Sequence, residues 1–155
     1  MLESSTLTAA DLMTPDVRTV RPDTALRTAI KLMLAGGFSG MPVVDEAGKA
    51  IGMLTEGDLI RWTEQQTPRA RWWLDMLADG HELSGEFMAA IRDEHAKVRA
   101  AMTKPVVGVT EKTPVRDVAR LLAEQGIKRV PVLRDDRPVG IITRRDLVGA
   151  LLKDL

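Results

Sequence analysis

The sequence predicts a mixed α/β (α+β) fold in which two pseudo-symmetric β-α-β-β-α repeats pack sheet to sheet, with a helical insert between them. Residues 13–47 align without a gap with residues 102–136, and residues 51–60 align with 139–148 after one residue is lost in a turn. Within each copy, short apolar runs alternate with segments of helical period. A repeat that occurs only twice is not a solenoid, because stacked arrays need three or more units to bury their faces.

Each repeat is expected to begin with a short strand and a helix. In the first copy, residues 17–20 alternate with a period of two, as in a half-buried strand. We expect residues 23–24 (Asp-Thr) to cap the helix that follows. In the second copy residues 113–114 (Thr-Pro) are expected to do so, with the proline at the first helical position. Glycines 36–37 and Gly126 are expected to end these two helices.

Two paired strands and a second helix are expected to complete each repeat. In the first copy, residues 41–44 and 51–54 are short apolar runs on either side of a turn. Residues 129–133 and 139–142 repeat this pattern in the second copy. We expect the closing helix of the first repeat to begin at Thr55.

A segment without a counterpart separates the two copies. We therefore divide the chain into a first repeat (8–62), a helical insert (63–99) and a second repeat (100–155). The tryptophans, all in or beside the insert, are Trp62, Trp72 and Trp73. Two interpretations account for them: a helical hairpin packed onto the α/β body, or a surface for a partner or for self-association.

The composition argues against several classes of protein. At 155 residues the chain is long enough to bury one core, and without cysteine it has no disulfide, thiolate metal site or cysteine nucleophile. No apolar run approaches the roughly 20 residues that span a bilayer. The first residues lack the pattern of a signal peptide. We expect a cytoplasmic protein without a membrane partner.

The charge is balanced overall but unevenly distributed. Residues 1–60 carry 5 Lys/Arg and 8 Asp/Glu, residues 61–101 carry 6 and 7, and residues 102–155 carry 11 and 7. A nucleic-acid partner is not expected, because the total lacks the basic excess that drives binding to a phosphate backbone. The basic second repeat reflects either two solvated surfaces that differ by chance or a site that faces an anion.

Catalytic and metal chemistry are not indicated. His81 and His95 have no second ligand at metal-binding spacing. Glycine-rich phosphate loops are missing, and no Ser or Thr has a plausible histidine base. We expect no catalytic residues, no metal site and no catalytic cofactor.

The motif Gly-apolar-apolar-Thr-x-x-Asp occurs once in each repeat, at 52–58 and 140–146. Taken alone, each Thr-x-x-Asp is typical of a capping box, with the acid favoured by the helix dipole. Its recurrence at one place in a repeated unit also fits a nucleoside-phosphate site. A helix N-terminus suits a phosphate, and a carboxylate one turn further on can accept hydrogen bonds from ribose hydroxyls. The apolar residues that would flank a purine are Val17, Met41 and Pro42 in one copy, and Val106, Val130 and Pro131 in the other.

The ordered set of motifs, present twice, resembles the cystathionine-β-synthase (CBS) domain family, arranged as the tandem pair known as a Bateman module. The resemblance covers residues 8–60 and 100–152 and includes the Met-Pro-Val-Val and Val-Pro-Val-Leu strands. It implies a regulatory module that binds AMP, ADP, ATP or S-adenosylmethionine between the repeats. The sequence leaves open which of these ligands binds and whether Mg²⁺ accompanies ATP. The resemblance also implies a homodimer, with a protein target that the sequence does not identify.

The resemblance assigns roles to individual residues. Asp58 and Asp146 would hold ribose hydroxyls, and Thr55 and Thr143 would meet phosphate. Residues before the Pro-Val strand often add phosphate contacts in the family. These are Lys128 and Arg129 in the second copy and Ser39 and Gly40 in the first; the second motif also carries Arg144 and Arg145 in place of Glu56 and Gly57.

This asymmetry predicts that the site around Asp146 binds phosphorylated nucleotides more tightly than the site around Asp58. The alternative for residues 128–129 is a solvated start of a strand. For the whole chain, the alternative is a ligand-free dimerisation or docking module that acts through the Trp-rich insert, both motifs being helix caps only.

Overall fold

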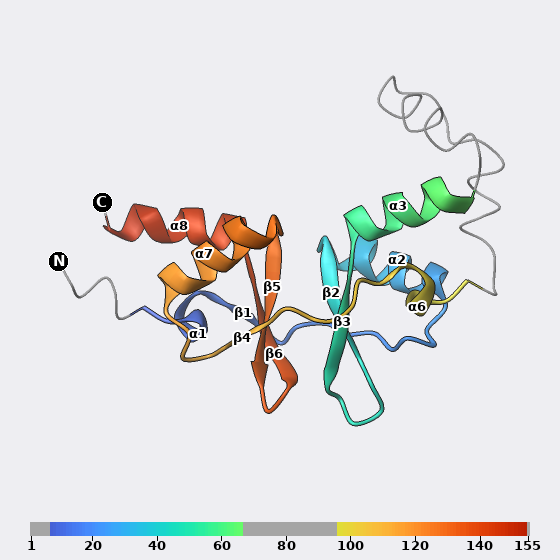
Figure 1. The fold of residues 1–155 in the computed structure, drawn as a ribbon, viewed down its shortest axis with the longest axis horizontal. Coiled ribbons are helices and arrows are strands. Elements are labelled where there is room, and N and C mark those ends of the chain that lie inside the picture. Colours follow the sequence, from blue (N-terminus) through green and yellow to red (C-terminus); the bar gives the residue numbers. More distant parts are fainter. Residues whose placement is uncertain (1–6, 67–95, 155) are drawn as a thin grey trace, which may run out of the picture.

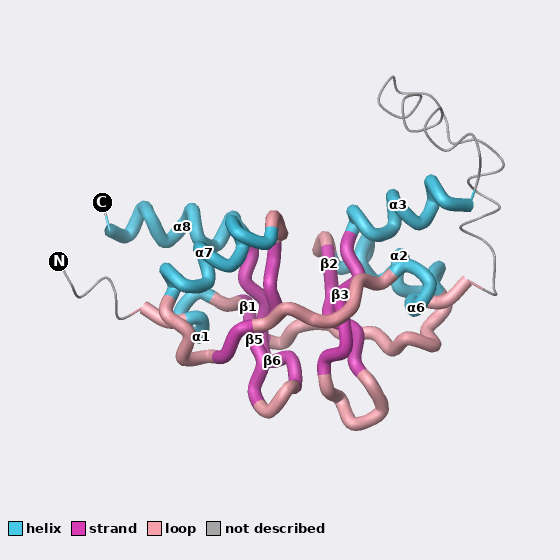
Figure 2. The backbone as a smooth tube through the Cα atoms, viewed as in Figure 1, coloured by secondary structure: helices cyan, strands magenta, loops and turns pink. Residues whose placement is uncertain are grey.

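The computed structural model describes residues 7–66 and 96–154. Most of the expected insert, with Trp72, Trp73, His81 and His95, lies outside these ranges. Two β-sheets lie next to each other in the middle of the molecule, and the helices cover their outer sides (Figure 1). Figure 2 shows the same arrangement of a helical layer, two layers of strands and a second helical layer. The mixed α/β fold expected from the repeat is therefore present.

The larger sheet contains three strands of the second repeat and one short strand of the first. Its order is β1-β6-β5-β4, with β6 antiparallel to both neighbours and β4 parallel to β5. These strands are β1 (Thr14–Pro15), β4 (Val109–Thr110), β5 (Arg129–Arg134) and β6 (Arg137–Thr143). The smaller sheet pairs β2 (Gly40–Val44) antiparallel with β3 (Ala50–Thr55).

Two single-residue β-bridges give the smaller sheet the same pattern of strand pairing as the larger one. Val20 pairs parallel with Val43, as β4 pairs with β5, and Thr103 pairs antiparallel with Met53, as β1 pairs with β6. The strand expected at residues 17–20 is thus reduced to a single bridge at Val20.

The first residues of each repeat pack with the other repeat. Strand β1 belongs to the first repeat in sequence but joins β6, and helix α1 (Ala9–Leu12) contacts α7 and α8 (Figure 1). Helix α6 (Val98–Ala101) likewise contacts α3. The sequence repeats and the packing units are therefore not the same segments, because each unit receives its first strand and short helix from the other copy.

Four longer helices flank the sheets: α2 (Leu26–Gly36), α3 (Glu56–Gln66), α7 (Val115–Gln125) and α8 (Arg144–Asp154). The expected glycine ends are confirmed, because Gly37 and Gly126 cap α2 and α7 with φ of 66° and 62°, which only glycine adopts without strain. Helix α3 extends through residues 63–66, which the sequence division had placed in the insert.

The expected caps of α2 and α7 are wrong. Helix α2 has Ala25 as its N-cap, and the hydroxyl of Thr24 accepts a hydrogen bond from the amide of Arg21 instead. Pro114 is the N-cap of α7, so the proline lies one position before the first helical residue. The Thr113 hydroxyl accepts from the amide of Thr110. Both threonines close the turn that precedes the helix, because a short polar side chain competes for nearby backbone groups.

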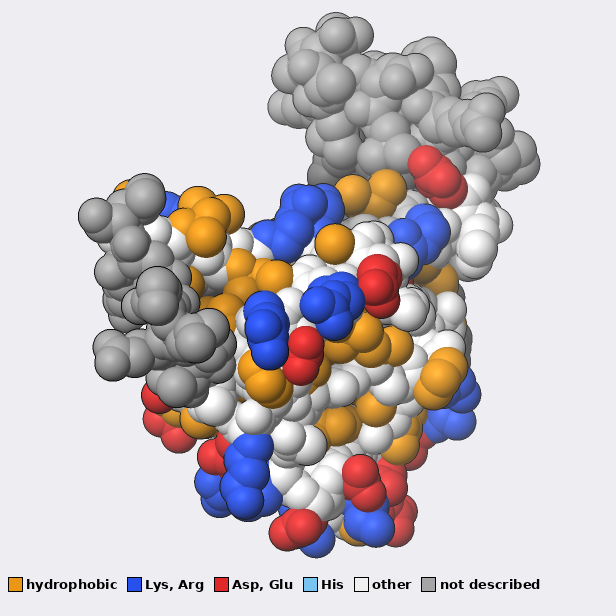
Figure 3. All heavy atoms as spheres, turned by 60° about the vertical axis from the view of Figure 1, so that its left-hand side comes forward, with side chains coloured by type: hydrophobic (Ala, Val, Ile, Leu, Met, Phe, Trp, Pro, Cys, Tyr) orange, Lys and Arg blue, Asp and Glu red, His pale blue; other side chains and the backbone are white. Residues whose placement is uncertain are grey.

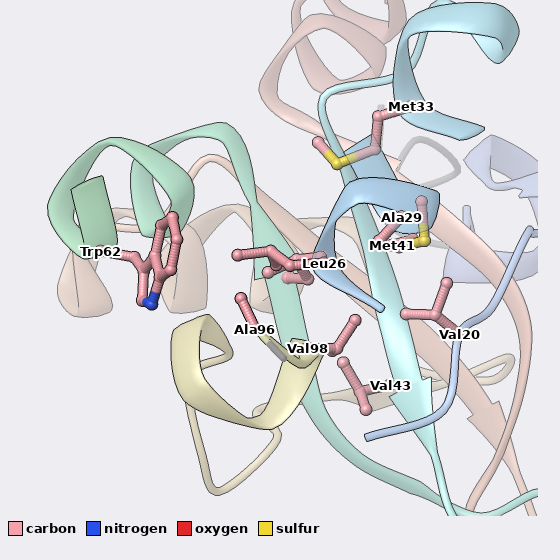
Figure 4. Packing of buried hydrophobic residues seen from close by; sticks show 10 residues of the cluster. Val20, Leu26, Ala29, Met33, Met41, Val43, Trp62, Ala96 and Val98 are labelled. Carbon is pink, nitrogen blue, oxygen red and sulfur yellow. The ribbon is translucent and has the colours of Figure 1, made fainter. Parts of the chain in front are cut away.

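Each sheet has its own apolar core. The first core includes Leu26, Met41 and Leu54, and Trp62 lies at its edge with 7% of its surface exposed (Figure 4). The second core is formed by Ala9, Val109, Val118, Leu122, Val130, Val132 and Ile142. Trp62 therefore contributes to packing, whereas Trp72 and Trp73 lie outside the described residues.

Charged side chains of both signs are interspersed on the face drawn in Figure 3. Among the described residues, no helix is long and apolar enough to cross a membrane. The same part of the chain holds no group of three or more His, Asp or Glu side chains arranged for a metal ion.

Candidate functional site

Both Thr-x-x-Asp motifs form capping boxes at helix starts. In the first, the amide of Thr55 donates to Oδ2 of Asp58 at 2.9 Å, and the amide of Asp58 donates to Oγ1 of Thr55 at 3.2 Å. In the second, the amide of Thr143 donates to Oδ2 of Asp146 at 2.8 Å, and the return bond to Oγ1 of Thr143 is 3.3 Å. The capping interpretation is therefore correct for both motifs. It does not exclude a ligand, because each carboxylate has a second oxygen.

The second oxygen of Asp58 is held by side chains. Oδ1 accepts a hydrogen bond from Oγ1 of Thr103 at 2.6 Å, and the guanidinium of Arg61 forms an ion pair with the same oxygen. Asp58 is only 3% exposed. A buried carboxylate needs such partners, because burying a charge without them is costly.

The second oxygen of Asp146 is in a different environment. Within the described ranges, no side chain or amide donates a hydrogen bond to its Oδ1, whereas Oδ2 also accepts from Oγ1 of Thr143 at 3.1 Å. Asp146 is also only half-buried. The same Thr-x-x-Asp motif thus gives two carboxylates that differ in how many hydrogen bonds they already accept.

A cavity of about 330 Å³ opens at the first helix start. Residues from both repeats line it: Met53, Thr55, Glu56, Gly57, Asp58 and Arg61 from the first, and Thr103, Pro105, Val107, Gly126, Ile127, Lys128 and Arg129 from the second. Its volume lies at the lower end of the range of roughly 300–1,000 Å³ that is usual for small-molecule sites.

The expected grouping of cations with acids is corrected by this cavity. The sequence placed Lys128 and Arg129 with Asp146, in their own repeat, but their side chains line the cavity of Asp58. The reason is the packing of the repeats. A Cβ built on Gly40 would lie 2.8 Å from Cδ of Arg129, so the start of β5 faces the start of β2 and reaches across to α3.

The expected apolar wall is also different. Met41, Pro42, Val130 and Pro131 are fully buried within the sheets and do not line the cavity. Its apolar lining comes instead from Met53, Pro105, Val107 and Ile127. Sequence reasoning missed these residues, although Met53 occupies a middle position of the motif and Val107 follows the expected Val106.

The remaining expected residues lie near the helix starts without lining this cavity. The carbonyl of Ser39 accepts from the amide of Glu56 at 3.0 Å, and the carbonyl of Lys128 accepts from the amide of Arg144 at 3.0 Å. Val17 and Val106 are half-buried, and Arg144 and Arg145 are exposed. In each repeat, a backbone carbonyl just before the Pro-Val strand therefore accepts a hydrogen bond from the first amide of the closing helix.

Arg129 lines the cavity and interacts with charged groups of both repeats. Burial lowers the pKa of its guanidinium, the carboxylates of Glu56 and Asp58 raise it, and the neighbouring Arg144 lowers it. Its Nε is buried and has no hydrogen-bond partner in the described part of the chain. A buried donor without an acceptor is uncommon, and this one lies against Gly40 of the first repeat.

The fold is a pseudo-symmetric pair of α/β units with a cavity lined by residues of both repeats. The profile of the CBS domain family matches residues 9–64 and 98–153. The chain therefore belongs to the CBS domain family, as a tandem CBS pair of the Bateman type.

Similar proteins share this organisation. An uncharacterized protein of Methanocaldococcus jannaschii is 31% identical over 142 residues, which are 86% of this chain and 84% of that protein. The crystal structure of the CBS domain of a CBS domain-containing membrane protein from Sphaerobacter thermophilus has a TM-score of 0.74 and 31% identity. The match covers 96% of this chain and 90% of that one.

A third similar protein has been crystallised with a nucleotide. The structure of CBSX2, a CBS-pair protein of Arabidopsis thaliana, in complex with AMP has a TM-score of 0.70 and 26% identity, covering 95% of this chain and 97% of that one. This chain spans 64% of the full length of chloroplastic CBSX2.

Proposed function

We propose that this CBS pair is a regulatory module that binds an adenine nucleotide in the cavity at the start of α3. One observation carries the proposal. A single cavity of about 330 Å³ combines the Thr55/Asp58 helix start of the first repeat with Lys128 and Arg129 of the second. A carboxylate, a helix N-terminus and two cations are the groups that a nucleoside phosphate requires.

The parts of the nucleotide have separate partners in this proposal. The phosphate meets Lys128, Arg129 and the hydroxyl of Thr55 at the positive end of the α3 helix dipole. The ribose hydroxyls donate to Asp58, and the base lies against the apolar lining around Ile127.

Similarity to a nucleotide-binding protein supports the class of ligand. CBSX2, at 26% identity, has been crystallised with AMP. Because the small cavity suits one nucleoside more readily than a dinucleotide, AMP and ADP are the first candidates. ATP with Mg²⁺ and S-adenosylmethionine are the competing adenosyl ligands.

Binding would be transmitted through the contact between the two repeats. A ligand shifts a conformational equilibrium only if it binds the two states differently. A nucleotide in this cavity would touch both repeats and therefore favour one angle between them. A homodimer and an unidentified protein target complete the proposal.

The test is isothermal titration of the protein with AMP, ADP, ATP with and without Mg²⁺, S-adenosylmethionine and NAD. We expect one adenosyl ligand to bind, and Asp58→Ala to weaken that binding by at least tenfold, because the ribose loses its acceptor. Asp117→Ala on α7 is the matched control, since Asp117 also lies in the first turn of a helix but away from the cavity.

Two results would contradict the proposal. If no adenosyl ligand binds, the motifs are helix caps only, and the docking alternative through the Trp-rich insert becomes the better explanation. If a ligand binds but Asp146→Ala abolishes binding while Asp58→Ala does not, the cavity at α3 is the wrong site.

A further inference from the structure

The two helix starts carry a glycine and an arginine in exchanged positions. In α3, Gly57 immediately precedes Asp58, and Arg61 follows it by almost one turn. In α8 the order is reversed, with Arg145 before the aspartate and Gly149 after it. In α3 this order brings the guanidinium of Arg61 to Asp58, whereas Arg145 forms no ion pair with Asp146 in the described part of the chain.

The guanidinium of Arg61 lies across the first turn of α3. It pairs with Oδ1 of Asp58 and lines the cavity. A Cβ built on Gly57 would lie 3.5 Å from Nη1 of Arg61 and 3.7 Å from Oγ1 of Thr55. Arg61 is thus at the same helix start as the carboxylate proposed for the ribose and the hydroxyl proposed for the phosphate.

Little of the Asp58 carboxylate remains free. The amide of Thr55 holds Oδ2, while Thr103 and Arg61 hold Oδ1. A carboxylate has about four acceptor positions, so two ribose hydroxyls cannot both bind until one of these partners leaves. Arg61 is the partner free to leave, because 63% of its side chain is exposed and water can solvate it.

We propose that Arg61 is an internal competitor for the ribose at Asp58 and thereby makes this site selective for phosphorylated adenosyl ligands over unphosphorylated ones. The inference rests on the proposed function. A nucleotide that displaces Arg61 offers it a phosphate as a new partner inside the same cavity. Adenosine offers no such anion, so its binding must break the Arg61–Asp58 ion pair without replacing it.

The experiment compares AMP with adenosine by isothermal titration, with every protein carrying Asp146→Ala so that the Asp58 site alone is measured. Arg61→Met keeps a helix-forming side chain of similar length and removes the charge. We expect it to tighten adenosine binding by about tenfold and to leave AMP binding unchanged or weaker, so the ratio of the two affinities falls by about tenfold or more. Arg120→Met is the control, because Arg120 pairs with Asp117 on α7 at the same i,i+3 spacing.

A double variant tests the exchanged positions directly. Gly57→Arg with Arg61→Gly gives α3 the order found in α8, and a side chain at Gly57 has room because no atom lies closer than 3.5 Å to its built Cβ. We expect adenosine to bind as tightly as it does to Arg61→Met. AMP should bind more tightly than to Arg61→Met, because a guanidinium is present again without occupying Asp58.

The outcomes separate this inference from the proposed function. If AMP binds in an Asp58-dependent manner but Arg61→Met weakens adenosine and AMP equally, or changes neither, Arg61 is not a competitor and the inference is wrong. If neither AMP nor adenosine binds the parent protein, the inference is overturned, and the proposed function is overturned as well unless another adenosyl ligand binds in an Asp58-dependent manner.

Discussion

The starts of α3 and α8 have the same capping geometry but offer different chemistry to a ligand. Both aspartates accept a bond from the threonine amide, at 2.9 and 2.8 Å. Asp58 is buried and its other oxygen is occupied, whereas Asp146 is half-buried and its other oxygen has no donor in the described ranges. A repeated motif thus conserves the fold of each unit, while residues outside the motif decide what each unit can bind.

The difference comes from what each helix start faces. The start of α3 is opposite Lys128 and Arg129 of the second repeat. The equivalent residues of the first repeat are Ser39 and Gly40, which carry no charge. The second helix carries its own cations, Arg144 and Arg145, instead. The start of α3 therefore receives two cations from the other repeat in addition to Arg61 of its own helix, whereas Arg144 and Arg145 belong to α8 itself.

The largest expected effect tests whether the two cores are equivalent. Leu54 and Ile142 occupy matching positions in β3 and β6, and both are fully buried. Leu54→Ala and Ile142→Ala should each lower the free energy of unfolding by about 2–5 kcal/mol, because each leaves a cavity in a packed core. Urea denaturation monitored by circular dichroism measures both. A difference of more than about 2 kcal/mol would contradict the equivalence of the cores.

The next effect concerns the glycine that opens each motif. A Cβ on Gly52 would lie 2.5 Å from the backbone oxygen of Thr103, whereas the three atoms nearest to a Cβ on Gly140 all belong to the Met13 side chain. Gly52→Ala should therefore destabilise the protein by about 2–3 kcal/mol and Gly140→Ala by about 1 kcal/mol, because a side chain moves more easily than a backbone. Thermal unfolding of the two variants gives the comparison. If both variants are destabilised equally, the backbone of Thr103 moves aside as easily as the side chain of Met13, and the prediction is wrong.

The next, smaller effect is the contribution of each aspartate to the stability of the protein without ligand. Asp58→Ala should lower the free energy of unfolding by about 2–3 kcal/mol, because it removes the cap and also leaves the Thr103 hydroxyl without its acceptor. Asp146→Ala should cost about 1 kcal/mol, the usual value of a cap. Chemical denaturation at neutral pH measures both variants. A larger cost for Asp146→Ala would show that the extra bonds of Asp58 do not stabilise the fold.

The smallest effect is a pH dependence confined to the second repeat. The two hydrogen bonds from Arg134 hold the pKa of Glu111 below its usual value of 4.5. The charged form is favoured in the folded state, so this contribution is present above the unfolded pKa and is lost as the pH falls through the folded pKa. The first repeat has no such pair, because Asp45 and Pro22 occupy the equivalent positions.

Glu111→Gln should therefore be slightly less stable than the parent protein at pH 7, and the difference should disappear as the pH falls through the lowered pKa of Glu111 in the folded state. Urea denaturation at pH values from 7 to 3 measures it. A difference that stays constant with pH would mean that the Glu111–Arg134 pair is not the cause.

Much of the fold could be predicted because it depends on neighbours in sequence. The strand–turn–strand pattern, the glycine caps at Gly37 and Gly126, and the two capping boxes were all expected and are present. The errors of local structure, at Thr24 and Thr113, arose because a threonine hydroxyl can serve either the helix or the preceding turn. Sequence alone does not weigh these two local hydrogen bonds.

The candidate site was predicted only in part. Thr55 and Asp58 were identified because their roles are local, within four residues of one helix start. Arg61, Thr103 and Val107 were missed, and Lys128 and Arg129 were grouped with the wrong aspartate. Thr103, Val107, Lys128 and Arg129 reach the cavity through the packing of one repeat on the other, whereas Arg61 lies on α3 itself, three residues after Asp58.

The sequence by itself determined the repeat, the mixed α/β class, the helix ends and the position of both Thr-x-x-Asp motifs, because hydrogen bonds between near neighbours set these features. The tertiary structure alone decided which repeat supplies β1 and Thr103 to which sheet, and which aspartate faces Arg129. A pseudo-symmetric pair leaves this choice open in the sequence, since either copy's helix start has the same local pattern. Only the packing of the two sheets brings Arg129 to Asp58.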